Sequence, residues 1–352
     1  GTRSARESRS CFGMRRSRSE PAWRCGWPAA GFVLGAVACL VPAPARAQAP
    51  PSGRVPANEC CLPLLLPVGA RALAVGHALA ARPSPDAVFV NPAGLARLRG
   101  DQFVVHHATN VAGDATALSL LFAREAIGTL GLSYQLLDAG EIESTDEAGN
   151  VTGVLALRDH MLWASFATPI SRELAAGFNY KLYRLSATCT RVCGEDAQSG
   201  TTHAVDVGVQ YRPGWLPSLE VGVSVVSLGF PLQVVNAAQA DELPTRLRVG
   251  AAYNVLGRAR PDTALALWIS LEVSQSVRDP GRRIPSIGVE LAVRDAVFLR
   301  AGHAGGEGLE GWTAIGLGVQ HQRFTVGVAK PFGVSGLDSG REPFQVSFGV
   351  AL

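Results

Sequence analysis

The stretch "ALALWISLEVS", residues 264–274, alternates between apolar and mixed side chains along its whole length. The apolar positions are Leu265, Leu267, Ile269, Leu271 and Val273, and the positions between them are Ala266, Trp268, Ser270, Glu272 and Ser274. A repeat of two residues places each set on its own face of a β-strand. The stretch has 11 residues, and a tilted strand needs about 9 to 11 residues to cross a membrane. It therefore predicts a membrane-crossing strand with one lipid-facing side.

About fourteen segments of this kind follow one another through the C-terminal part of the chain. They begin near Gln102, Ala115, Ile127, His160, Leu174, Thr202, Leu219, Thr245, Ala264, Pro285, Val297, Trp312, Phe324 and Phe344. A series of alternating segments separated by turn residues is typical of a membrane barrel. We therefore predict an all-β fold, a transmembrane antiparallel β-barrel of about 14 strands over residues 101–352.

The connections between these segments alternate in length. Short connections lie near Arg124, Pro169, Arg294 and Gln322, and long ones cover residues 138–159, 187–200, 228–244 and 331–342. In a transmembrane barrel the periplasmic turns are short and the extracellular loops are long. A soluble sandwich explains the strands but not this alternation. The pattern predicts that both ends of the barrel lie in the periplasm, although the connection at residues 254–262 is longer than a tight turn.

Residues 1–47 are predicted to be upstream residues and a signal peptide. Arginines follow Met14, an apolar run spans residues 29–40, and small residues end at Ala47. This order is typical of secretory signal peptides. We predict cleavage near Ala47 and a location in the bacterial outer membrane.

Residues 48–100 are predicted to form an N-terminal arm and a plug. The inward faces of the predicted strands carry mostly small side chains, which cannot fill the lumen of a barrel of about fourteen strands. Within this region "NPAGLARL", residues 91–98, has a helix start, because Asn91 can cap and Pro92 suits the first helical position. We predict that this short helix lies inside the barrel.

Four charged residues lie on the predicted inward faces of consecutive strands. They are Arg246, Arg248, Glu272 and Glu290. Opposite charges at these positions can pair with one another, with the plug, or with the headgroup of a ligand. The sequence leaves these alternatives open.

Two pairs of cysteines remain after residues 1–47. Cys189 and Cys193 lie in one of the long connections, and we predict a disulfide between them, with free thiols as the alternative. A metal site would need more ligands than the nearby His203, so none is predicted. For the adjacent Cys60 and Cys61, a tether and free thiols both stay open.

Composition and motifs argue against other functions. The net charge is only +3, and no interleaving of basic and aromatic residues indicates nucleic-acid binding. No nucleophile elbow, phosphate loop or zinc-protease motif occurs, so we predict no enzyme and no cofactor. An outer-membrane lipid hydrolase is the weaker alternative, because serine, histidine and aspartate residues occur on several predicted strands.

Residues 69–100 resemble the start of the PorV/PorQ outer-membrane family, which is itself similar to the FadL family of long-chain fatty-acid transporters. The matching positions are Gly69, Ala70, Arg71, Ala72, Leu73, Gly76, Asp86, Asn91, Pro92, Ala93, Gly94 and Leu95. The resemblance implies a plug motif at Asp86, Asn91, Pro92, Ala93 and Gly94.

Two functions follow from this resemblance. FadL-like members pass hydrophobic small molecules, whereas PorV-like members receive cargo from type IX secretion, which is typical of bacteria with lysine-rich proteins. The chain has only Lys181 and Lys330, which favours passage or binding of hydrophobic molecules. The predicted partners are outer-membrane lipid and such molecules, with envelope proteins of a secretion system as the alternative.

Overall fold

The computed structural model describes residues 59–352 except positions 111, 126, 147, 193–198, 236–238, 257–263, 307–310 and 334–342. The predicted signal peptide and the first part of the predicted arm therefore lie outside the described residues. Among the residues that are described, no helix is long and apolar enough to cross a membrane.

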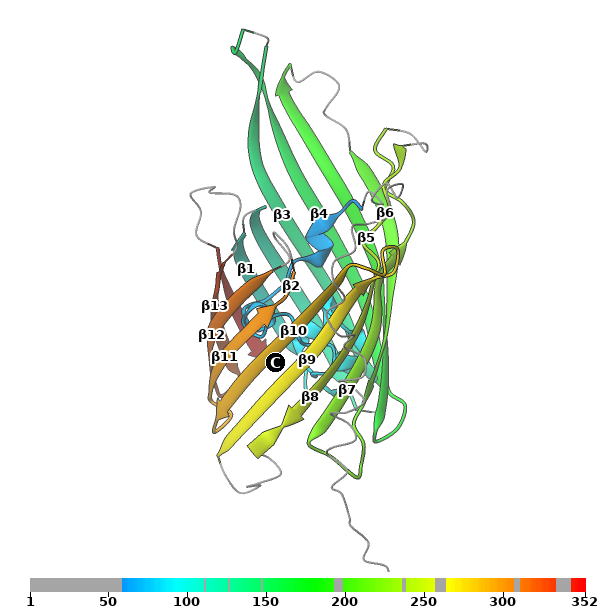
Figure 1. The fold of residues 1–352 in the computed structure, drawn as a ribbon, viewed down its shortest axis with the longest axis vertical. Helices are drawn as coiled ribbons and strands as arrows, with labels where there is room; N and C mark the ends of the chain where they lie inside the picture. Colours follow the sequence, from blue (N-terminus) through cyan, green and yellow to red (C-terminus); the bar gives the residue numbers. More distant parts are fainter. Residues whose placement is uncertain are drawn as a thin grey trace, which may run out of the picture. The chain divides into compact units, whose positions relative to one another are not determined.

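Fourteen antiparallel strands form one closed barrel, as the alternation predicts (Figure 1). Each strand pairs with its neighbours in sequence, and the first strand also pairs with the last. The strands are β1 (Gln102–Asn110), β2 (Gly113–Arg124), β3 (Gly128–Thr145), β4 (Val151–Pro169), β5 (Leu174–Arg191), β6 (Gly200–Tyr211), β7 (Leu219–Gly229), β8 (Arg246–Asn254), β9 (Leu265–Ser276), β10 (Arg283–Val293), β11 (Val297–Ala304), β12 (Trp312–His321), β13 (Phe324–Phe332) and β14 (Phe344–Ala351).

Three strands are longer than expected. The strands β3, β4 and β5 have 18, 19 and 18 residues, whereas crossing a membrane takes about 9 to 11. The predicted loop at residues 138–159 is therefore mostly strand, and β4 begins at Val151 instead of near His160. Residues 151–157, "VTGVLAL", are rich in valine, threonine and leucine, and they pair with the end of β3. Figure 1 shows these strands rising well above the others.

The outer face of the barrel is apolar over a broad band. Large hydrophobic side chains on many strands are between about a third and a half exposed, including Leu120, Leu132, Val209, Leu317 and Val328. So large a continuous apolar surface is unfavourable in water and favourable against lipid. The fold therefore has the outer surface of a membrane barrel.

Residues 59–100, which we call the lumen segment, fill the barrel from the inside. Its helical turns are η1 (Leu62–Leu65), α2 (Ala70–Ala74), η2 (Pro85–Phe89) and η3 (Pro92–Arg97). Most side chains between positions 68 and 95 are buried. The predicted helix after Asn91 is present as η3, a 3-10 helix of 6 residues instead of an α-helix.

The lumen segment crosses the barrel lengthwise. Glu59 contacts Arg246, where β8 begins at the end that carries the long connections. Arg97 donates hydrogen bonds to the carbonyls of Arg172 and Glu173, in the short connection between β4 and β5. We call these the long-connection end and the short-connection end of the barrel.

Candidate functional site

Asn91 fixes the middle of the lumen segment to the barrel wall. Its side chain is fully buried, and its Oδ1 accepts a hydrogen bond from the backbone N–H of Ala93 at 3.1 Å. Its Nδ2 donates to the carbonyls of Ala80 at 2.7 Å and Val209 at 3.1 Å. Asn91 therefore caps η3, as expected, and also links the lumen segment to β6 by a hydrogen bond.

Glycines on the inner wall allow this close contact. A side chain at Gly208 would overlap Asn91 Oδ1, and one at Gly222 would overlap the carbonyl oxygen of Ala80. Further inward glycines lie directly against the backbone or an alanine side chain of the lumen segment, namely Gly177, Gly288, Gly302 and Gly316. Backbone therefore packs on backbone where larger residues would hold the two apart.

The other residues of the plug motif lie around Asn91. Pro92 takes the first position of η3, and Ala93 and Gly94 are buried behind it. Asp86 lies in η2 with an Oδ1 that is 3.5 Å from His106 Nε2 on β1.

A hydrogen-bonded chain joins the lumen segment to the seam between β1 and β14. His106 Nδ1 lies 2.8 Å from Ser347 Oγ on β14, and this oxygen accepts a hydrogen bond from the N–H of Ala70 at 2.8 Å. Together with the contact between Asp86 and His106, the chain ties α2 and η2 to the strands that close the barrel.

The four charged residues expected on the inner face are all buried there, and they contact the lumen segment. Arg246 pairs with Glu59 through two contacts of 2.7 Å. Arg248 lies 2.6 Å from Glu272 and donates to the carbonyl of His77 at 2.8 Å. The second oxygen of Glu272 accepts the N–H of Ala80 at 2.8 Å.

Glu290 is the centre of a cluster that also contains Arg71, Arg82 and Arg300. Its carboxylate lies 2.9 Å from Arg71 Nε, 3.4 Å from Arg82 and 2.7 Å from Arg300 Nε. Arg82 also lies 3.5 Å from the ring centroid of Trp268. We call these three arginines and Glu290 the arginine cluster.

A cavity of about 380 Å³ lies beside the arginine cluster at the short-connection end. The lumen segment forms one wall, and β1 and β10–β14 form the other. Its charged lining residues are Arg71, Arg82, Asp86, Glu290, Arg300 and Arg323. Gln322 and Arg323 of the turn between β12 and β13 also border it, so the cavity reaches that end of the barrel.

Sequence reasoning missed the arginines of the cluster and a second buried ion pair. Lys181 Nζ lies 2.8 Å from Asp206 Oδ1 on the opposite side of the lumen, and both side chains are almost fully buried. Asn179 donates to Asp206 and to the carbonyl of Val88, each at 2.8 Å. The available signal was a lysine at an inward strand position in a chain that has only two lysines.

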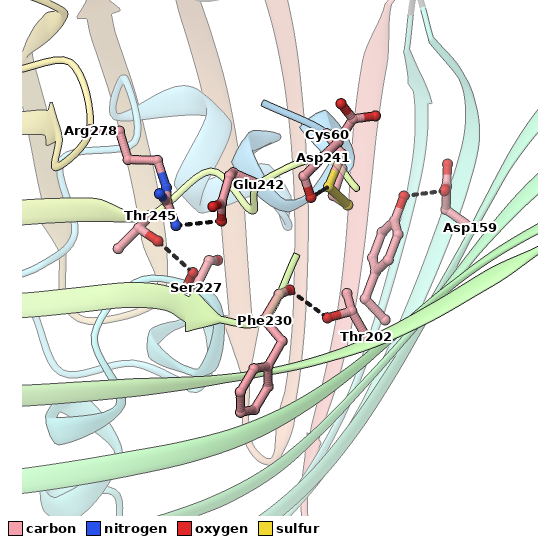
Figure 2. Close-up of a disulfide and its surroundings, with 11 residues drawn as sticks. Cys60, Asp159, Thr202, Ser227, Phe230, Asp241, Glu242, Thr245 and Arg278 are labelled. Carbon is pink, nitrogen blue, oxygen red and sulfur yellow. Dashed lines mark hydrogen bonds and ion pairs between the residues drawn. A yellow bond between two sulfur atoms is a disulfide. The ribbon is translucent and has the colours of Figure 1, made fainter. Parts of the chain in front are cut away.

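Cys60 and Cys61 form a disulfide with each other, at the start of the lumen segment. Figure 2 shows Cys60 beside Asp241 and Glu242, which belong to the long connection between β7 and β8. The N–H of Cys60 donates to the carbonyl of Glu242 at 2.9 Å. The disulfide thus lies where the segment enters the barrel.

The disulfide predicted between Cys189 and Cys193 stays a prediction. Cys189 lies in β5, close to the end of that strand, whereas Cys193 lies outside the described residues. Within the described ranges, no group of three His, Cys, Asp or Glu side chains is placed to hold a metal ion.

Neither a family model nor a curated protein matches the chain. Solved structures do match it. The toluene transporter TodX of Pseudomonas putida has a TM-score of 0.56 at 13% identity, over 80% of this chain and 96% of TodX. The monoaromatic hydrocarbon channel CymD has a TM-score of 0.54 at 14% identity, over 81% and 97% of the two chains. A FadL homologue of Pseudomonas aeruginosa has a TM-score of 0.51 at 12% identity, over 81% and 99%.

These likenesses show that the chain has the fold of FadL-like channels. At 12–14% identity they show the fold alone.

Proposed function

We propose that the chain is a bacterial outer-membrane barrel that binds and passes hydrophobic small molecules. The observation that carries the proposal is a closed barrel of fourteen strands with an apolar outer band and a lumen occupied by its own N-terminal segment. Two of the similar structures are a toluene transporter and a monoaromatic hydrocarbon channel, and they support the same class of cargo.

The short-connection end faces the periplasm in this proposal. The barrel begins at Gln102 and ends at Ala351, and these two residues pair with each other at that end. Long connections then face the outside of the cell, as in other transmembrane barrels. A signal peptide ending near Ala47 would deliver the chain across the inner membrane.

The lumen segment is the plug, and its two halves are held differently. Around η2 and η3 it packs large side chains such as Phe89 and Leu95 against Leu121, Met161 and Trp163 of the barrel. Around α2 the buried contacts are mostly alanines, supplemented by the arginine cluster. Because most of the apolar side chains packed around α2 are small, we expect this half to be the part that moves when a molecule passes.

Proteoliposomes test the proposal. Purified protein reconstituted into liposomes with an outer leaflet of lipopolysaccharide, which slows the entry of hydrophobic molecules, is expected to speed the entry of radiolabelled toluene, compared with such liposomes that contain boiled protein. Sucrose, which is polar, should not enter faster. Equal toluene entry in both preparations would contradict the proposed passage, and entry of both molecules would indicate an unselective pore.

Membership of the PorV/PorQ family, with envelope proteins as partners, remains the second prediction. Affinity purification from cross-linked cells tests it. Specific recovery of other envelope proteins would favour an accessory role in secretion over passage of small molecules.

A further inference from the structure

We propose that the cavity beside the arginine cluster binds a compact organic anion. The inference deepens the proposed function, on which it rests for the idea that small molecules travel through the barrel. It names a chemical class for one place on that path, the short-connection end.

Three guanidinium groups share one carboxylate in the arginine cluster. Arg71 contributes Nε and a terminal nitrogen to Glu290 at 2.9 and 3.0 Å, and Arg300 contributes its Nε at 2.7 Å. Arg82 donates one hydrogen bond to Glu290 at 3.4 Å and one to Glu220 at 3.2 Å, from its two terminal nitrogens. A guanidinium has five N–H donors, so one carboxylate cannot satisfy three such groups.

Positive charge therefore exceeds negative charge around the cavity. Four arginines and two carboxylates line it, since Arg323 joins the cluster and Asp86 joins Glu290. Asp86 is directed to His106, and Glu220 also pairs with Arg212. Asp86, Glu220 and Glu290 offset the three arginines of the cluster, so the surplus positive charge comes from Arg212 and from Arg323 at the cavity.

Burial strengthens ion pairs at this place. The side chains of Arg82 and Arg300 are only 12% and 8% exposed, so water solvates them poorly. Each guanidinium already has a carboxylate partner, and a further ion pair is stronger in such a poorly hydrated place than in water. A bound anion would supply the missing negative charge and accept the remaining N–H donors.

The cavity also has an apolar side. Val104, Phe298, Pro83 and Pro85 line it together with the charged groups. Its volume of about 380 Å³ is near the lower limit of ligand pockets, which span about 300 to 1,000 Å³. The ligand that fits this mixture is a small organic acid with one apolar ring or short chain, whereas a bare inorganic anion would leave the apolar wall uncovered.

Neutral hydrocarbons fit this place poorly. A molecule without charge gains nothing from buried guanidinium groups and prevents water from reaching them. The names of the similar structures refer to toluene and monoaromatic hydrocarbons. The arginine cluster would therefore give this barrel a preference for acids at its short-connection end.

The direct test compares benzoate with benzamide, which has nearly the same shape and no charge. Isothermal titration of the purified full-length barrel in detergent is expected to show binding of benzoate and at least about tenfold weaker binding of benzamide. Inorganic phosphate should bind more weakly than benzoate. Equal affinities for benzoate and benzamide, phosphate binding as tight as that of benzoate, or no binding of benzoate would each overturn the proposal.

Matched arginine variants locate the site. Arg323→Gln removes an exposed lining charge without disturbing the buried cluster and should weaken benzoate binding about two- to fivefold. Arg172→Gln is the control, because Arg172 is an exposed arginine in another short connection at the same end and does not line the cavity. Equal effects of the two variants would overturn the location.

Glu290→Gln gives a result that a purely structural role does not predict. Removing the carboxylate frees the three arginines, so benzoate should bind more tightly and should raise the melting temperature of this variant more than that of the wild type. Unchanged or weaker binding in a folded Glu290→Gln barrel would overturn the proposal. If this variant does not fold, the comparison of benzoate affinity between Arg323→Gln and Arg172→Gln decides whether the cavity is the binding site.

Binding and passage fail separately. Titration needs no passage, and toluene entry into proteoliposomes needs no anion. No benzoate binding together with protein-dependent toluene entry would overturn only the anion site. Benzoate binding without protein-dependent toluene entry would contradict only the proposed passage.

Discussion

At the scale of single residues, contacts between the lumen segment and the barrel wall depend on the absence of side chains. Asn91 reaches Val209 only because Gly208 has no Cβ at that point. The same relation places the carbonyl of Ala80 against Gly222. Loss of a contact from the lumen segment should therefore loosen that segment first, whereas an added side chain on the wall should force the segment and its strand apart.

Replacing Asn91 with alanine should loosen the lumen segment and leave the barrel folded. The substitution removes three hydrogen bonds, and loss of the cap alone costs about 1 kcal/mol. Hydrogen exchange of the folded protein is expected to rise in residues 84–98 and to stay unchanged in the central strands. Faster exchange throughout the barrel would contradict this separation.

Gly222→Ala should destabilise the protein, whereas Gly349→Ala should not. A Cβ at Gly222 would meet the backbone of Ala80, while the nearest atoms at Gly349 are 3.8 Å away. Overpacking of this kind costs about 1 to 3 kcal/mol. The measurement is the temperature at which the folded band disappears on a denaturing gel, and similar temperatures for both variants would be the opposing result.

At the scale of elements, alternation predicted the strands well because it is a local property of the chain. Thirteen of the strands begin within two residues of the expected positions, and the exception is β4. The arginine cluster was not predictable in this way. Arg71, Arg82 and Arg300 meet because the lumen segment crosses to β10 and β11, and no local pattern specifies that path.

Ile269 and Ile142 distinguish the lipid-facing band from the extended strands. Ile269 lies on the outer face of β9 and is 36% exposed, and Ile142 lies in the projecting part of β3 and is 52% exposed. Ile269→Arg should cost about 2 to 4 kcal/mol in a lipid bilayer, and Ile142→Arg close to nothing. Equal costs in refolding titrations would mean that the band does not face lipid.

Cys189, one half of the predicted disulfide with Cys193, lies near the end of the long strand β5. In a variant with serine at Cys60 and Cys61, maleimide added to intact cells should label the protein only after a reducing agent is added. Labelling without the reducing agent would show free thiols, and no labelling after reduction would place this connection inside the cell.

At the scale of the whole molecule, the small inward side chains of the strands leave the space that the lumen segment occupies. The sequence predicted a plug because small inward side chains could not fill the lumen, and most side chains of residues 68–95 are buried there. Which half of the segment is held by large apolar side chains depends on contacts between distant residues. Only the structure supplies those contacts.

Deleting residues 55–100 should leave a folded barrel with an open channel. The fourteen strands pair without help from the segment, and its removal empties the lumen. Planar bilayers should show steady conductance for the deleted form and almost none for the intact form. Equal conductance would mean that the segment does not close the barrel.

The seam between β1 and β14 also constrains how the molecule is made. Ala70 and Pro67, which leave the ribosome early, hydrogen-bond to Ser347 and Gln345, which leave it almost last. These contacts favour entry of the segment before the last strand closes the barrel, because afterwards it could enter only through an end of the barrel. The lumen segment is therefore expected to be in place before β14 completes the barrel. A chain that ends before Phe344 would leave β1 and β13 each with one unpaired edge exposed to the assembly machinery.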